Sequence, residues 1–94
     1  MRSAIGNSEQ KIDELKKKGY DPVYVWNAEP NEEDLDHTHT FDTRLAVLEG
    51  EIEIRMDGKS VILKPGNEID IPREKVHYGE AGAIGCKYIV AEKH

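Results

Sequence analysis

Cysteine and long apolar runs are both scarce in this sequence. Its 94 residues include one cysteine, Cys86, so an internal disulfide is excluded. The longest apolar runs cover four or five residues, whereas a membrane-spanning helix needs about 20. The first ten residues also lack the apolar stretch of a secretory signal. These features predict a cytoplasmic protein that does not enter a membrane.

Positive charge is scarce as well. The formal net charge is −6 and the isoelectric point is about 5.2. The one basic cluster, residues 16–18, is a short lysine run. An acidic chain without a basic stripe is a poor partner for nucleic acid or for anionic lipid. Ninety-four residues suffice for one domain with a small core, so we expect the protein to gain stability by forming a homodimer.

Sequence periodicity divides the chain into two parts. Residues 8–18 predict a helix that Asn7 or Ser8 caps and that Gly19 ends. From residue 21 the apolar residues recur with the period of a strand, most clearly in residues 51–56. We therefore expect a helical extension over residues 1–19 and an all-β domain over residues 20–94.

About eight short strands at close spacing are predicted in the second part. The Asp57-Gly58 pair predicts a hairpin turn, and Pro65-Gly66 predicts another turn. The segment 29–36 is interpreted as an acidic, solvated loop, and 81–85 as a turn of small residues. Such a pattern is typical of an antiparallel sandwich or barrel. The first strand, with Tyr24 and Trp26, is the element we expect to meet a partner subunit.

Three histidines suggest a metal site. His37 and His39 are two positions apart, so on one strand both would point to the same side. His77 falls on another predicted strand, which a barrel can place beside the first. Three imidazoles suit a divalent transition metal such as Fe, Mn, Ni, Zn or Cu. The alternative is that these side chains are polar groups on a surface strand.

The spacing of these histidines resembles that of the cupin superfamily. Its first motif is a Gly, five residues, His-x-His, three or four residues, a Glu, six residues and a second Gly. Its second motif is a Gly, five residues, Pro-x-Gly, two residues, a His, three residues and an Asn. Six of the ten motif positions agree: His37, His39, Gly50, Gly66, Pro72 and His77. The departures are Asn31, Thr43, Glu74 and Ala81. The resemblance covers about residues 20–92 and implies a small double-stranded β-barrel, or jelly roll, that binds a metal through His37, His39 and His77.

Thr43 is the departure that bears on chemistry, because it stands where the family's glutamate ligand belongs. A neutral hydroxyl is a weak ligand for a divalent ion. Three interpretations remain open. The metal is held by three histidines and water, or Asp42 replaces the glutamate, or the site is a ligand pocket without metal. Asparagine tolerates left-handed backbone geometry, so Asn31 is a mild departure.

Further residues are candidates for a pocket beside the histidines, namely Phe41, Thr43, Cys86 and Tyr88. His94 is expected to be an exposed, frayed end of the sequence and not a ligand. No residue pattern for nucleophilic or acid–base catalysis stands out, so no catalytic residue is assigned. Two functions remain: a metal-dependent dioxygenase or isomerase acting on a small molecule, or a non-enzymatic cupin that binds or senses a small ligand.

Overall fold

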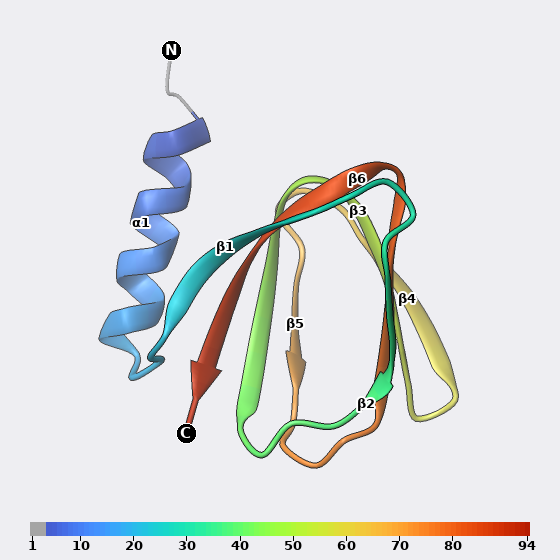
Figure 1. The fold of residues 1–94 in the computed structure, drawn as a ribbon. Coiled ribbons are helices and arrows are strands. Elements are labelled where there is room, and N and C mark those ends of the chain that lie inside the picture. Colours follow the sequence, from blue (N-terminus) through green and yellow to red (C-terminus); the bar gives the residue numbers. More distant parts are fainter. Residues whose placement is uncertain (1–3) are drawn as a thin grey trace.

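The computed structural model describes residues 4–94, with side chains described from residue 8 onward. One helix precedes six strands: α1 (Ala4–Lys17), β1 (Val23–Ala28), β2 (Glu33–His37), β3 (Asp42–Met56), β4 (Lys59–Leu63), β5 (Glu68–Ile71) and β6 (His77–Lys93). All strand pairs are antiparallel. The strands curl into a small barrel, and α1 lies beside it next to β1 (Figure 1). The prediction of an all-β jelly roll with one N-terminal helix is confirmed.

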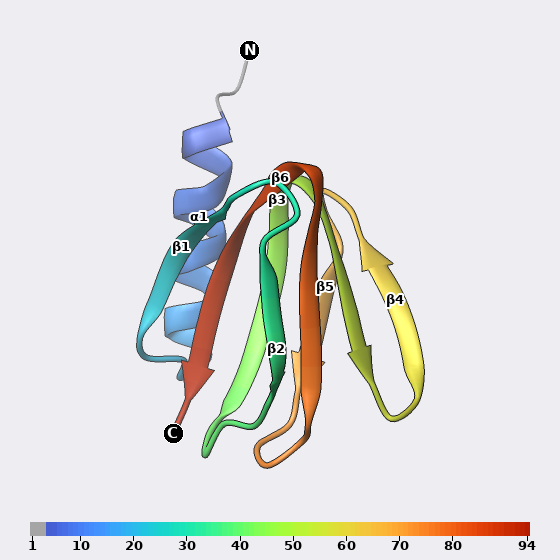
Figure 2. The ribbon, with the colours of Figure 1, turned by 45° about the vertical axis from the view of Figure 1, so that its right-hand side comes forward.

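Two long strands hold the barrel together. The central order is β1-β6-β3-β4, while β2 pairs with β6 and β5 pairs with β3. β3 and β6 pair from Asp42↔Lys93 to Arg55↔Tyr78, with two register shifts around Gly50. Both strands bend there and continue into the second half of the barrel, which Figure 2 shows from the side. Each long strand therefore takes part in both halves of the barrel wall.

Glycine is required at this bend. Gly50 has φ of +76° and Gly85 has φ of +86°, values that residues with a Cβ rarely adopt. A Cβ on Gly50 would lie 2.2 Å from the carbonyl oxygen of Gly85, and one on Gly85 would lie 2.7 Å from that of Ala28. The close approach of three backbone segments explains why Gly50, a motif position, cannot carry a side chain.

The core divides between the two faces of the sheet. Inside the barrel lies a cluster that includes Leu45, Ile54 and Ile71. On the outer face, α1 inserts Leu15, which is fully buried, against Ala46, Ile89 and Ala91. Burying a leucine side chain contributes about 2 kcal/mol. The helix thus covers the back of the sheet and leaves the barrel interior to the inward-facing side chains.

Four local predictions need correction. The helix begins at residue 4, so residues 7 and 8 lie inside it and do not cap it, although Gly19 does follow the helix with a positive φ of 98°. The segment expected to be an acidic loop contains β2, because its backbone pairs with β6 through Glu33↔Glu80 and Asp34↔Gly79. The expected turn 81–85 is part of β6. Strands predicted as separate are joined in β3 and β6, so the structure has six strands rather than about eight.

Candidate functional site

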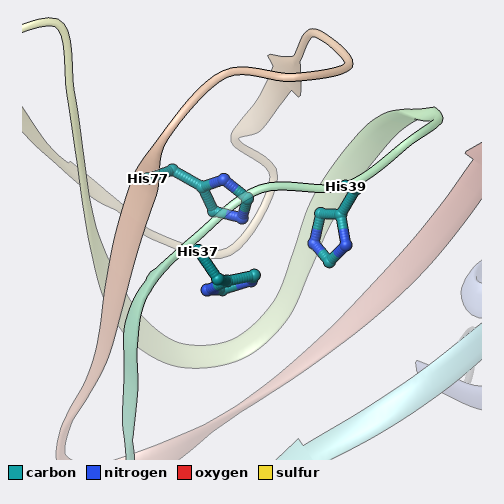
Figure 3. Close-up of side chains that lie close together, drawn as sticks. All are labelled: His37, His39 and His77. Atoms are coloured by element: carbon teal, nitrogen blue, oxygen red, sulfur yellow. The ribbon is translucent and has the colours of Figure 1, made fainter.

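The three candidate histidines lie together at one end of the barrel. His37 is the last residue of β2, His77 is the first residue of β6, and the two are direct partners across the strands. His39 lies in the connection 38–41, so the expectation that it shares a strand with His37 is wrong. Ring centroids are separated by 4.2 Å for His37–His77, 4.8 Å for His37–His39 and 5.0 Å for His39–His77. Figure 3 shows the three rings gathered in one space between the strands.

Two of the imidazoles are oriented by backbone carbonyls. Nδ1 of His37 lies 2.5 Å from the carbonyl oxygen of Leu35, and Nδ1 of His77 lies 3.0 Å from that of Lys75. A carbonyl accepts hydrogen bonds only, so each Nδ1 carries a hydrogen, and the neutral form of each ring has its lone pair on Nε2. Metal-binding histidines are commonly held in this way by a group behind the ring. In both rings, the lone pair of Nε2 can therefore bind a metal ion.

His39 is positioned through its backbone and through its ring. Its carbonyl oxygen accepts a hydrogen bond from the backbone N–H of Glu74 at 2.8 Å, which ties the connection 38–41 to the β5–β6 turn. Its ring stacks on Phe41 at 4.8 Å between centroids. Burial, followed by the charges of His37 and His77, lowers the pKa of His39 below its usual value. The neutral form, which is the form that binds a metal, is thereby favoured.

The spacing of the three histidines fits a metal ion after a small closure. One ligand atom from each residue lies within 4.8 Å of the others. Nitrogen ligands about 2.1 Å from a tetrahedral ion lie roughly 3.4 Å apart, so the rings must approach by about 1.4 Å. The neutral nitrogen donor set suits first-row transition metals.

The histidines border a cavity of about 250 Å³ inside the barrel. Phe41, Thr43 and Tyr88, all named as pocket candidates, line it. Cys86 does not line this cavity. It is buried among core residues and borders a separate hollow near Gly85, where burial raises the pKa of its thiol to about 11. The Cys86 thiol is therefore protonated at neutral pH.

Thr43 occupies the position of the missing glutamate and has an unusual environment. It is 5% exposed, and its Oγ1 has no hydrogen-bond partner among the described protein atoms. The neighbouring Asp42, the alternative carboxylate, instead accepts a hydrogen bond from the backbone N–H of Arg73 at 2.9 Å and pairs with its guanidinium. A buried hydroxyl without a partner is costly. Thr43 therefore lines the cavity with a hydroxyl that has no partner among the described protein atoms.

Sequence reasoning missed part of the cavity wall. Glu32 and Asp34, assigned to a solvated loop, line the cavity together with Tyr24 and Trp26 of β1. Glu32, Glu33 and Asp34 are consecutive acidic residues, so no alternation of apolar and polar residues signalled a strand there. His94 is exposed, as expected, but its ring lies 4.4 Å from that of Phe41, so it packs at the edge of the site.

The fold and site define a double-stranded β-barrel with a histidine-lined cavity. The family model described as "Cupin domain" matches residues 24–84. This match covers more than half of the sequence, so the chain belongs to the cupin family. No match was found among curated proteins. None of the described helices has the length and apolar character needed to cross a bilayer.

Solved structures share this fold. A cupin-like protein from Thermotoga maritima is 29% identical, with a TM-score of 0.69 over 76% of this chain and 55% of its own. A cupin-2 domain protein from Shewanella frigidimarina is 25% identical, with a TM-score of 0.67 over 77% of this chain and 69% of its own. KdgF from a Halomonas species is 19% identical, with a TM-score of 0.69 over 77% and 67%. At 19% identity, the similarity to KdgF concerns the fold alone.

Proposed function

We propose that this protein holds one divalent transition-metal ion, Fe, Mn, Ni, Zn or Cu, through His37, His39 and His77. The observation that carries the proposal is the convergence of three imidazoles on a cavity large enough for a small molecule. Two of the rings have their Nδ1 atoms engaged by carbonyls and their Nε2 atoms free. Three protein ligands leave coordination positions for water or for a bound molecule.

The proposed activity is that of a metal-dependent dioxygenase or isomerase acting on a small molecule. A bound ion would supply Lewis-acid or redox chemistry. The protein supplies a cavity lined by three hydroxyl-bearing residues, Tyr24, Thr43 and Tyr88, of which Tyr24 donates its hydrogen bond to Glu92. Burial raises the pKa of Tyr88 well above its usual value, so its hydroxyl remains protonated and serves as a hydrogen-bond donor. The hydroxyl of Thr43 can donate or accept.

A second candidate function is non-enzymatic binding of a small ligand without metal. The observation in its favour is Thr43, which stands at the position of the family's carboxylate ligand, lines the cavity and has no hydrogen-bond partner among the described protein atoms. Dioxygen consumption by metal-loaded protein, or conversion of a candidate substrate into its isomer, would separate the two functions. Turnover supports the enzyme, whereas stoichiometric binding without turnover supports the binding protein.

Metal binding is tested by removing each histidine in turn. His37→Ala, His39→Ala and His77→Ala should each lower the metal content of tag-free protein several-fold, as determined by mass spectrometry. His94→Ala is the matched control, because His94 lies outside the three-histidine group, and it should retain the wild-type metal content. Equal metal content in wild type and His77→Ala would refute the proposed site.

We also propose a homodimer, for which the free edge of β1 is the support. Within the described chain, β1 pairs with β6 alone, so its other edge is available to a second subunit. The core is small, and Trp26 on this strand is 48% exposed. Sedimentation equilibrium should give about twice the monomer mass of 10.7 kDa. A species of monomer mass at high protein concentration would contradict the proposal.

A further inference from the structure

Aromatic rings are concentrated around the cavity. Tyr24, Trp26, Phe41 and Tyr88 line it, which is four of the six aromatic residues in the sequence. Trp26 and Tyr88 are direct partners across β1 and β6, so their side chains stand next to each other on the inner face. The faces of such rings attract organic cations, most strongly when water is excluded. The wall formed by β1 and β6 therefore suits an apolar body that carries positive charge.

The charged groups in the cavity wall have one sign. Glu32 and Asp34 line the cavity, and among the described residues no lysine or arginine does so. With neutral histidines, the lining carries a formal charge of −2 from these two carboxylates. An anionic ligand would therefore be repelled unless a metal offset that charge, whereas a cation would be attracted.

The two carboxylates are placed by different means. Oε2 of Glu32 accepts a hydrogen bond from Nε1 of Trp26 at 3.0 Å, and its Oε1 accepts one from the backbone N–H of Glu29 at 3.1 Å. The carboxylate is thus fixed at the edge of the indole ring. Asp34 lies opposite Gly79, a residue without a side chain that also lines the cavity. A Cβ on Gly79 would lie 3.8 Å from that of Asp34, so any side chain at residue 79 would pack against Asp34.

Thr43 adds an unpaired hydroxyl to the residues that line this cavity. Its Oγ1 is buried and has no partner among the described protein atoms. A threonine hydroxyl can accept a hydrogen bond from an ammonium N–H. We propose that the cavity takes a small organic cation, an alkylammonium or arylalkylammonium compound. This inference rests on the second candidate function, ligand binding without metal, because a divalent ion would offset the charge of the two carboxylates.

Trp26 provides a direct assay, because it is the only tryptophan in the sequence and lines the cavity. Three probes of similar size and different charge are compared by titrating the tryptophan fluorescence: 2-phenylethylammonium, 2-phenylethanol and 3-phenylpropanoate. The protein is first stripped of metal with a chelator, so that amine coordination to an ion cannot contribute. We expect the ammonium compound to bind about tenfold more tightly than the alcohol, and the carboxylate to bind most weakly.

Two charge-removing variants and one control complete the test. Glu32→Gln and Asp34→Asn should each reduce the preference for the cation over the alcohol several-fold. Glu33→Gln is the matched control, because Glu33 lies between them on the chain but accepts a hydrogen bond from Tyr78 and does not line the cavity. It should keep the preference. Circular dichroism verifies that each variant is folded.

Three outcomes would overturn the inference: no fluorescence response to the cation, equal or tighter binding of the carboxylate, or an unchanged preference in the Glu32→Gln and Asp34→Asn variants. The test is independent of the proposed metal site because metal-free protein is used. If the histidine variants lose metal but the three probes bind with equal affinity, the metal proposal stands and the proposal of an organic cation is refuted. If the histidine variants keep their metal content but the ammonium probe binds most tightly, only the metal proposal is refuted.

Discussion

Replacing Thr43 by valine should stabilise the metal-free protein. Valine has nearly the shape of threonine, so the change removes the buried Oγ1 and retains the packing of the side chain. An unsatisfied buried polar group costs about 1–3 kcal/mol, and Oγ1 of Thr43 has no partner among the described protein atoms. We expect Thr43→Val to raise the free energy of unfolding by about 1 kcal/mol, the low end of that range, since solvent can enter the neighbouring cavity.

The assay is thermal unfolding of chelator-treated protein, monitored by circular dichroism. For a domain of this size, 1 kcal/mol corresponds to a rise in Tm of about 4–8 °C. Thr43→Ser is the control, because it keeps the hydroxyl and removes a buried methyl group, and it should unfold at a lower temperature than wild type. A Thr43→Val protein that melts below wild type would show that the hydroxyl is satisfied in the free protein, and the reasoning would fail.

Three other residues give sharp expectations. Glu74 has φ of 64°, a left-handed value at a motif glycine position, so Glu74→Gly should add about 0.5–1 kcal/mol of stability in urea unfolding and Glu74→Ala should not. Leu15→Ala should cost about 2–4 kcal/mol, because Leu15 is fully buried under the sheet, and an unchanged Tm would contradict that packing. Arg44 binds both carboxylate oxygens of Asp70 at 2.7 and 2.9 Å and lowers its pKa below 3.8. This pair stabilises the fold above about pH 4 by up to about 1 kcal/mol and loses that contribution as the pH falls through the lowered pKa. Asp70→Asn should therefore be less stable than wild type at pH 7 and equal to it near pH 2, and a constant difference would refute the assignment.

The strands and turns that were predicted correctly are those whose positions depend on neighbouring residues in the sequence. The alternation in residues 51–56 and the Asp57-Gly58 turn correspond to the end of β3 and the hairpin to β4. Asn31, expected to tolerate left-handed geometry, has φ of 59°. These features depend on a few neighbouring residues, so the sequence alone was enough to predict them.

Features set by distant pairing were not predictable in the same way. β2 is acidic and forms because its backbone reaches partners in β6 that lie 40 to 47 positions later in the sequence. The small residues 81–85 resembled a turn, but they permit β6 to bend while pairing on both sides. His39 joins the other histidines through the fold of a connection rather than through strand alternation. The acidic part of the cavity wall was missed because its strand was missed.

The pairing of β3 with β6 has a consequence for how the chain folds. Residues of β3 contact partners between 23 and 51 positions later in the sequence, as Arg55↔Tyr78 and Asp42↔Lys93 show. Such high contact order predicts slow folding, on the scale of milliseconds to seconds. During synthesis, the histidine cluster cannot form before β6 leaves the ribosome, because the partner of His37 is His77 of β6. Until then β1 and β2, which pair with β6 alone, lack their partner strand, and unpaired strands of this kind expose the nascent chain to aggregation.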